Sequence, residues 1–515
     1  MMRKVFSLPP RHGRGRSTLP MMLALIATFV MLCAYPLSAA AADTPTVQVT
    51  VDTHHTLATI PETALGTNAA VWDGHLLDQG VPDLLHNAGV KVIRYPGGST
   101  SDVYHWQSNT TEPNQGYANP NNTFDAFMKV AQATGAQPMI TVDYGAGTPQ
   151  EAASWVQYAN KGGAGYTGPV PTYTGRSSTG HTYGIKYWEI GNELYGNGTF
   201  GANWEYDLHE KGPVAYANNA LQFIQAMKAV DPSIKIGIVL TSPGDWPDSV
   251  TAPGLSTDWN NTVLSILGKH VDFADVHWYA QNPGNESDAG LLASTSALPG
   301  KVATLKTELQ QYSPGKHVPI MITETNSVSY NPGKQTTNLV NALFLASTYM
   351  NWLESGVQNV DWWDIHNGIV TWGNNDPTLY GSNQYGDYGL LSTGDSEPPA
   401  NTPFPTYYSL QMLHHFIDGD GSMVASSTDQ GLIEVHAVRQ YNGKLALLLI
   451  NKDPQQSYQL KLAGGCGDQQ ASATVYFYGQ NSSAITVQHI SGKALSTQTL
   501  PPYSLTTIVL NGESN

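Results

Sequence analysis

Residues 186–196 read Lys-Tyr-Trp-Glu-Ile-Gly-Asn-Glu-Leu-Tyr-Gly. The aromatic and apolar first half predicts the end of a buried β-strand, and Gly191 allows the backbone to turn where this strand ends. Asn192 and Glu193 follow at the exit. A carboxylic acid can donate a proton to a leaving oxygen, and a neighbouring amide can hold a hydroxyl group, so this pair suits chemistry on a sugar.

A second stretch has the same design. Residues 318–326 read Val-Pro-Ile-Met-Ile-Thr-Glu-Thr-Asn, so Glu324 also follows an apolar strand. In a (β/α)₈ barrel the active site lies at the carboxyl ends of the strands. Hydrolysis of a glycosidic bond uses two carboxylates. The two stretches together predict a barrel that carries both glutamates on one face.

The region 61–400 alternates short apolar runs with amphipathic segments, which predicts a parallel sheet with crossover helices. Eight strands close the common barrel, so the expected fold is α/β, a (β/α)₈ TIM barrel. Three long loops, 104–122, 161–181 and 369–401, are expected on the face of the two glutamates. The eight expected strands are 64–68, 90–95, 137–144, 185–192, 234–240, 271–279, 319–323 and 357–365.

The region 401–515 reads as an all-β sandwich, because short alternating runs are separated by turn signals such as Asn442-Gly443. The alternating segment 46–51, within an N-terminal stretch 43–60, is expected to add a strand to this sandwich. The expected strands of the sandwich are 433–439, 444–451, 458–462, 473–478 and 504–510.

Residues 1–42 resemble a signal peptide, with five basic residues, an apolar run at 21–32 and a series of small residues before position 43. Their removal would change the net charge from −16 to −21. We therefore expect a secreted protein that does not bind nucleic acid and, after cleavage, does not bind membranes. Outside this segment Cys466 is the single cysteine, so no intramolecular disulfide is expected. Composition leaves the oligomeric state open.

Glu193 is the candidate general acid/base, and Glu324 is the candidate nucleophile. In a retaining mechanism the nucleophile is ionised while the acid is protonated, so their surroundings must separate the two pKa values. Arg94 and Tyr279 are expected to hold Glu324 ionised, by an ion pair and a hydrogen bond respectively. Asn192 is expected to bind a substrate hydroxyl.

Two further side chains are candidates for the cleft. His277 lies two positions before Tyr279 on one strand, so both share a face, although a packing role is an equal alternative for His277. Only one of Trp362 and Trp363 can point inward, and Trp363 is the candidate for stacking on a sugar ring.

Other reaction classes lack their motifs. No close His-x-His or His-Glu-x-x-His pattern, phosphate-binding glycine loop or Gly-x-Ser-x-Gly turn occurs. The sequence therefore predicts no catalytic metal and no cofactor.

Residues 188–193 (Trp-Glu-Ile-Gly-Asn-Glu), together with 94–98 (Arg-Tyr-Pro-Gly-Gly), resemble the retaining glycoside hydrolases of clan A. Within that clan the chain is most similar to family 51 α-L-arabinofuranosidases. Residues 148–160 also resemble the helix that follows strand three in that family. The resemblance implies the roles given above for Asn192, Glu193 and Glu324, and sites for Arg94 and Tyr279 beside the nucleophile. Leu194-Tyr195 departs from the family pattern.

The expected activity is cleavage of O-glycosidic bonds in polysaccharide by double displacement, as an α-L-arabinofuranosidase. Residues 323–326 (Thr-Glu-Thr-Asn) equally resemble heparanase-like β-glucuronidases, so a β-glycosidase or endo-glycanase is one alternative. A carbohydrate-binding protein without catalysis is the other. The sequence leaves open the sugar, the linkage, exo or endo action, and whether the sandwich binds glycan.

Overall fold

The computed structural model describes residues 44–162, 172, 182–463, 472–495 and 498–511. The predicted signal peptide, most of the loop 161–181 and Cys466 lie outside these ranges. No helix in the described part of the chain has the length and apolar character needed to cross a bilayer.

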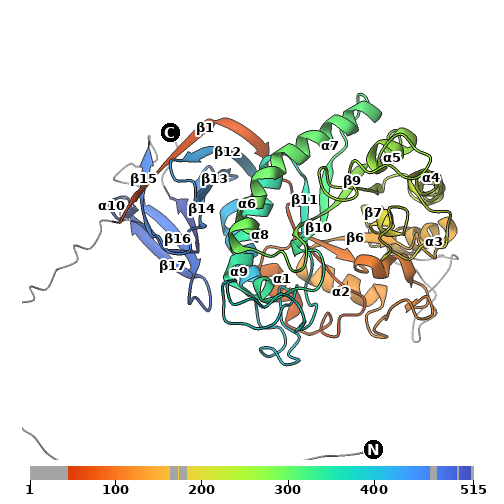
Figure 1. The fold of residues 1–515 in the computed structure, drawn as a ribbon, viewed down its shortest axis with the longest axis horizontal. Coiled ribbons are helices and arrows are strands. Elements are labelled where there is room, and N and C mark those ends of the chain that lie inside the picture. The colour runs from red at the N-terminus through yellow and green to blue at the C-terminus, as the bar shows by residue number, and fades with distance from the viewer. Residues whose placement is uncertain (1–43, 163–171, 173–181, 464–471, 496–497, 512–515) are drawn as a thin grey trace, which may run out of the picture. The chain divides into compact units, whose positions relative to one another are not determined.

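Eight parallel strands close into a barrel in the order β10-β11-β2-β3-β6-β7-β8-β9. Figure 1 shows helices around the labelled barrel strands β6, β7, β9, β10 and β11. The predicted (β/α)₈ barrel is therefore confirmed. Its strands are β2 (Leu65–Asn68), β3 (Val92–Tyr95), β6 (Gln137–Val142), β7 (Tyr187–Ile190), β8 (Lys235–Leu240), β9 (Phe273–Gln281), β10 (Ile320–Val328) and β11 (Asn359–Trp362).

Strand β10 differs from the prediction, because it continues to Val328 and so contains Glu324 instead of ending before it. The pairing of β10 with β9 shifts register between Ile322 and Glu324, and its pairing with β11 shifts between Ile322 and Thr325. Such irregularities bend a strand and redirect its side chains, and they often lie beside active sites. The strand extends because Thr325, Asn326 and Val328 continue the pairing with β9.

Helices surround the barrel, as expected for strands buried on both faces. They are α1 (Val81–Asn87), α2 (Phe124–Thr134), α3 (Pro149–Asn160), α4 (Pro213–Val230), α5 (Trp259–Leu267), α6 (Asp288–Ser294), α7 (Leu298–Tyr312) and α8 (Leu339–Glu354). Helix α8 is buried on nearly every side, because α9 (Pro405–Ile417) and the sandwich cover the face that other barrel helices expose. Short elements in the loops are η1 (Gly98–Val103), β4 (Tyr104–His105), β5 (Thr110–Thr111), η2 (Leu194–Gly196), η3 (Thr295–Ala297) and η4 (Lys334–Thr337).

The C-terminal region folds as a nine-stranded β-structure with a core of its own. Strand β1 (Thr46–Thr59) pairs antiparallel with β12 and parallel with β15, so the N-terminal strand closes the sandwich as its alternation predicts. The other strands are β12 (Gly421–Thr428), β13 (Ile433–Gln440), β14 (Leu445–Asn451), β15 (Tyr458–Ala463), β16 (Ser472–Gly479), β17 (Thr486–Ser491), β18 (Thr499–Leu500) and β19 (Ser504–Leu510), with the short helix α10 (Gly492–Leu495) after β17.

A buried ionic network joins the sandwich to α8. His436 lies between Glu354 (2.9 Å) and Glu434 (3.0 Å), and Lys452 pairs with Glu434 at 2.5 Å. Burial lowers the pKa of His436, but the two carboxylates outweigh this effect and raise it to about 10. The pKa of Glu434 stays well below its ordinary value, because His436 and Lys452 oppose the effect of burial.

Candidate active site

The exit of β7 fixes the position of Glu193. Gly191 has φ 76°, and a Cβ there would lie 2.3 Å from Leu194 and 2.8 Å from Tyr144, so this position requires glycine. Glu193 itself adopts the left-handed conformation with φ 31°, which costs a non-glycine residue on the order of 1–3 kcal/mol. A residue from another segment holds the chain in this conformation, since Asp102 Oδ2 accepts a hydrogen bond from the backbone N–H of Asn192 at 2.9 Å.

Glu324 enters the same space from β10. Its Oε1 accepts a hydrogen bond of 2.6 Å from the Tyr279 hydroxyl, and its Oε2 lies 3.2 Å from Arg94 Nη1. The Glu324 side chain is only 8% exposed. The structure thus brings together the three residues that the sequence places at the nucleophile.

His277 connects the two glutamates. Its Nδ1 lies 3.0 Å from Glu193 Oε1 and 3.9 Å from Glu324 Oε1. A carboxylate oxygen of Glu193 and one of Glu324 lie within 4.8 Å of each other. Retaining glycosidases place their carboxyl groups about 5–5.5 Å apart, whereas inverting enzymes need about 6.5–9.5 Å. The spacing therefore fits direct attack by one carboxylate.

Arg94 organises the floor of the site although it is fully buried. Besides Glu324, its guanidinium donates to Glu189 at 2.6 Å and to the Asn192 side-chain oxygen at 2.9 Å. The side-chain nitrogen Nδ2 of Asn192 in turn donates to Glu205 at 2.8 Å. These contacts fix which end of the Asn192 amide faces each neighbour, and each partner of Arg94 is buried.

Three donors surround Glu193 on its own side. His277, the Tyr195 hydroxyl (3.0 Å) and the Trp204 indole (2.9 Å) all contact its carboxylate. Burial acts to raise the pKa of Glu193, but these hydrogen bonds and the charge of His277 outweigh it and lower the pKa.

The pKa of Glu324 moves in the opposite direction. Burial and the charge of Glu193 raise it, against the lowering effects of His277, Arg94 and Tyr279. The unliganded site therefore orders the two pKa values in the sense opposite to the assigned roles. His277, between the two glutamates, carries the proton that the acid/base needs. Burial lowers the pKa of His277, but the charge of Glu324 and the hydrogen bond to Glu193 favour the imidazolium and raise this pKa to about 9.

Sequence reasoning missed several supporting residues. Glu189 carried a signal, since it is a carboxylate inside an otherwise apolar strand two positions before Gly191. Asp102 and Glu205 lie in loops and carried none. Burial is the largest influence on the pKa of Glu205 and, with the charge of Glu193, raises it to about 8.

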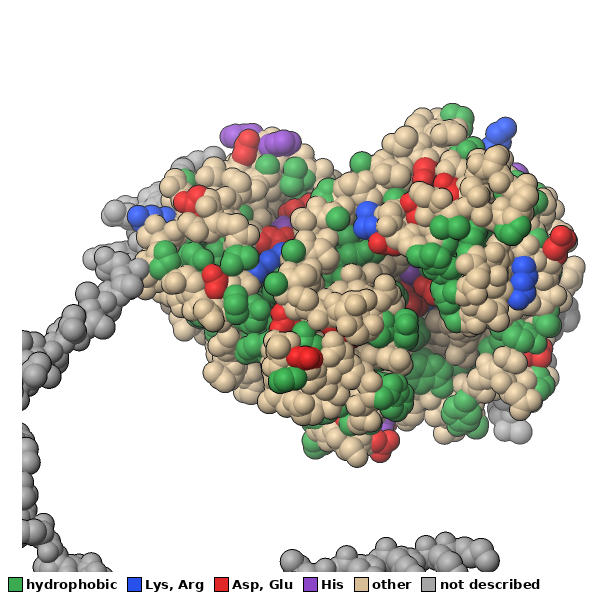
Figure 2. All heavy atoms as spheres, viewed as in Figure 1, with side chains coloured by type: hydrophobic (Ala, Val, Ile, Leu, Met, Phe, Trp, Pro, Cys, Tyr) green, Lys and Arg blue, Asp and Glu red, His purple; other side chains and the backbone are tan. Residues whose placement is uncertain are grey.

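Aromatic side chains form the wall of the cleft. Trp363 is half-buried and packs against Gly98, where a Cβ would lie 2.8 Å from its ring, while Trp362 is fully buried against α8. Trp204 and Trp246 are 46% and 47% exposed, with ring centroids 5.4 Å apart beside Glu193. Figure 2 shows a hollow in the barrel part of the molecule, with acidic and histidine side chains inside it and apolar side chains around it.

Comparison with solved structures shows that the fold resembles known ones. The chain is similar to an α-L-arabinofuranosidase from Thermotoga maritima solved with arabinose, with a TM-score of 0.67 at 19% identity over 90% of this chain and 99% of that one. A family 44 xyloglucanase from Paenibacillus polymyxa gives a TM-score of 0.64 at 16% identity over 91% of this chain and all of the other. At these identities the likeness concerns the fold.

Sequence comparison finds relatives with higher sequence identity than these two solved structures, over a shorter part of the chain. The α-L-arabinofuranosidase C of Emericella nidulans is 33% identical over 239 residues, which are 44% of this chain and 43% of that protein. The resemblance to the α-L-arabinofuranosidases on clan A barrels is confirmed. The chain spans less than half the length of the curated relatives it matches. No protein-family model matches it.

Proposed function

We propose that this protein is a retaining glycoside hydrolase that releases α-L-arabinofuranosyl groups from polysaccharide. The observation that carries the proposal is the pair of buried carboxylates, Glu193 and Glu324, with oxygens within 4.8 Å and both in reach of one imidazole. Surface carboxylates and isolated structural ion pairs do not need such an arrangement.

In the first step a carboxylate oxygen of Glu324 attacks the anomeric carbon, and the bond from this carbon to the leaving oxygen breaks. Glu193 gives that oxygen a proton. We assign the source of this proton to His277, which donates to Glu193 in the free site. A bound sugar excludes water from Glu193, and desolvation favours movement of the proton from the imidazolium to the carboxylate.

In the second step Glu193, now ionised, takes a proton from water as the water oxygen attacks the anomeric carbon. The ester bond to Glu324 breaks, and the configuration of the sugar is retained because two inversions have occurred. Arg94 and Tyr279 stabilise the returning carboxylate charge of Glu324.

Two features bear on the substrate. The Emericella relative is named as an arabinofuranosidase, which supports arabinose as the sugar. Arg94 is the single Lys or Arg that contacts either glutamate among the described residues, and its guanidinium is already used by buried partners. Within the described part of the chain, a uronic acid beside the two glutamates would therefore find no Lys or Arg free to pair with it, which disfavours the β-glucuronidase alternative.

An endo-glycanase is the second candidate. The exposed pair Trp204 and Trp246 beside the acid/base offers apolar surface to a further sugar unit of a chain, on the leaving-group side. The fold of the family 44 xyloglucanase is compatible with this reading.

We propose export from the cell and a carbohydrate partner on the sequence grounds given above.

The test is hydrolysis of nitrophenyl α-L-arabinofuranoside, β-D-glucuronide, β-D-xyloside and β-D-glucoside by wild type, Glu193→Ala and Glu324→Ala. Glu308→Ala, which removes a half-buried carboxylate on α7, is the matched control. Arabinofuranoside turnover that is lost in Glu324→Ala and kept in the control supports the proposal. Turnover of polymers such as arabinoxylan or xyloglucan, without turnover of the small glycosides, would favour the endo-acting alternative. Binding of these polymers without turnover would refute catalysis.

A further inference from the structure

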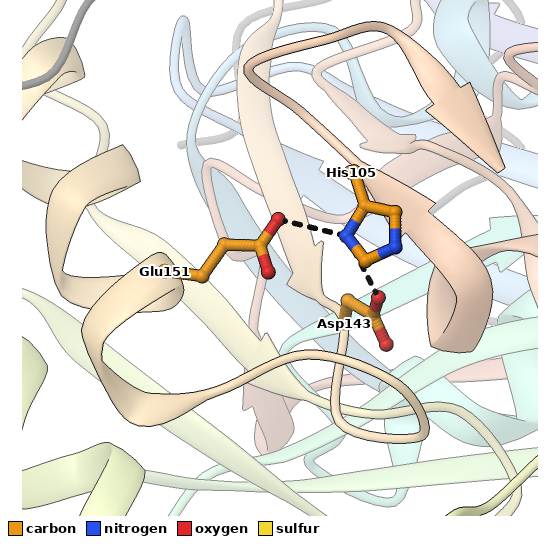
Figure 3. Close-up of side chains that lie close together, drawn as sticks. All are labelled: His105, Asp143 and Glu151. Carbon is orange, nitrogen blue, oxygen red and sulfur yellow. Dashed lines mark hydrogen bonds and ion pairs between the residues drawn. The ribbon is translucent and has the colours of Figure 1, made fainter. Parts of the chain in front are cut away.

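A second cluster of ionisable side chains lies outside the catalytic pair. His105 ends the short strand β4, Asp143 follows β6, and Glu151 stands in the first turn of α3. Figure 3 shows the three side chains directed toward one another from these separate segments. One ligand atom from each lies within 4.8 Å of the other two.

The imidazole of His105 has a carboxylate at each of its ring nitrogens. Its Nε2 lies 3.1 Å from Glu112, while its Nδ1 faces Glu151 at 3.1 Å and Asp143 at 3.8 Å. Histidines that bind metals commonly donate their second ring nitrogen to a carboxylate, which fixes the tautomer and leaves the first nitrogen free to bind. Glu112 occupies that supporting position.

Asp143 supplies an independent sign of a missing ligand. Its side chain is only 3% exposed, and its Oδ2, which points at the cluster, accepts no hydrogen bond from any described residue. Its Oδ1 accepts from the Ala146 amide at 2.8 Å. A buried carboxylate oxygen that accepts no hydrogen bond, and whose ion-pair partner His105 is 3.8 Å away, is costly, and a closely bound cation removes that cost.

The charge and the distances also fit a cation. Three carboxylates, including Glu112, face one imidazole that carries at most one positive charge. Two ligands of a tetrahedral Zn²⁺ at about 2.0–2.2 Å lie about 3.3–3.6 Å apart. The separations of 3.1 and 3.8 Å from His105 Nδ1 lie on either side of this range, and the carboxylate oxygens of Asp143 and Glu151 lie within 4.8 Å of each other, so the two carboxylates would adjust their positions around a bound ion.

We propose that His105, Asp143 and Glu151 bind one divalent transition-metal ion, with Zn²⁺ matching the mixed nitrogen and oxygen ligands and water completing the shell. His105 and Glu151 are 28% and 21% exposed, so the ion can enter from solvent. The sequence did not predict this site, because its ligands come from three segments without a short motif.

The site has a structural role near the acid/base. Asp143 is followed by Tyr144 and Gly145, whose amides both donate to Asp102 at 3.2 Å. Asp102 also holds the Asn192 amide. An ion bound at Asp143 therefore braces the loop that positions Asn192 and Glu193, without itself touching the reacting atoms.

The test uses the full chain after treatment with EDTA and removal of the chelator. Zn²⁺ binding is measured by calorimetry and elemental analysis, and thermal unfolding is followed with and without the ion. We expect one equivalent with a micromolar or tighter Kd at this site, and a rise in Tm of about 3 °C at a Zn²⁺ concentration a hundredfold above Kd. Mn²⁺ and Ca²⁺ are compared in the same way.

His105→Gln and Asp143→Asn are expected to lose this equivalent and the rise in Tm. Glu151→Gln, at the 21% exposed position, decides the matter if the other two variants do not fold. His75→Gln, which removes a histidine paired with Asp78 at 2.8 Å, and Glu324→Gln, in the catalytic cluster, serve as controls and should keep both effects. Equal Zn²⁺ content and equal Tm shifts in all the variants, or no retained Zn²⁺ in wild type, would overturn the proposal. None of these measurements depends on glycosidase activity.

Discussion

The contact between Tyr279 and Glu324 gives the sharpest test of the proposed nucleophile. Tyr279→Phe removes the hydroxyl that donates to Glu324 Oε1 at 2.6 Å and leaves the ring in place. Because this hydroxyl stabilises the ionised carboxylate, its loss must raise the pKa of Glu324 above the already raised value of the wild type.

The size of the effect follows from the contact. A hydrogen bond to a charged group contributes about 1.5–3 kcal/mol, and one pKa unit corresponds to about 1.4 kcal/mol. The acid limb of the pH profile, where activity rises as the nucleophile ionises, should therefore move upward by about 1–2 units. At a pH below the limb of the wild type, kcat/KM should fall by about 10- to 100-fold, and the difference should narrow at higher pH.

The assay is kcat/KM for nitrophenyl α-L-arabinofuranoside, or for whichever glycoside the enzyme turns over, from pH 4 to 9. Tyr349→Phe is the matched control, because this buried tyrosine donates to the Gly66 carbonyl at 2.9 Å and contacts neither glutamate. Thermal unfolding of both variants separates catalysis from stability. An unchanged acid limb in Tyr279→Phe, with a Tm loss like that of the control, would show that Glu324 is not the ionising nucleophile.

Three other perturbations test the surroundings of the site and the domain interface. The pKa of Glu205 is raised to about 8, so Glu205 carries a proton at pH 6. At that pH Glu205→Gln should keep kcat/KM within about threefold, whereas Glu205→Ala should lose about tenfold because the Asn192 side chain loses its partner. Equal losses in the two variants would contradict this role. Trp204→Phe removes a donor to the ionised Glu193 carboxylate, so an NMR titration of the free enzyme should show the pKa of Glu193 rising by about 0.5–1 unit, while the alkaline limb of kcat/KM, which reports His277, should stay in place; an unchanged pKa of Glu193 would contradict this contact. The pKa of His436 is raised to about 10, so the contribution of His436 to stability is complete below about pH 6.5 and is lost as the pH rises through 10. Urea unfolding should show this decline in the free energy of unfolding. His436→Gln should flatten the pH dependence and lower the free energy of unfolding by about 3–5 kcal/mol at neutral pH.

The strand pattern of the barrel could be read from the sequence, because strands covered on both faces are short continuous apolar runs and their alternation with amphipathic segments is regular. Prediction was poorer in the sandwich. Strand β12 (Gly-Ser-Met-Val-Ala-Ser-Ser-Thr) and the exposed β17 were missed, because serines, threonines and polar residues weaken their alternation. Strand β12 is held by pairing with β1, which is distant in the chain, and with β13, which follows it, whereas β17 is held by pairing with β16, which precedes it.

The candidate site divides in the same way. Glu193 and Glu324 stand beside apolar runs, and Tyr279 and His277 share one face of a strand, so local rules were enough to select them. Asp102, Glu205 and the cluster of His105, Asp143 and Glu151 lie in loops or at element ends, where local periodicity carries no information. Their significance depends on which segments meet in space.

The sequence by itself determined the (β/α)₈ barrel with its sandwich and the face on which the two glutamates lie, since these follow from apolar periodicity and from the parallel direction of the strands. The tertiary structure alone decided that the carboxylates lie within 4.8 Å, that His277 bridges them, and that burial and hydrogen bonds order their pKa values. Electrostatic effects depend on distances between groups far apart in the chain and on the exclusion of water around them. Neither quantity exists until the barrel has closed.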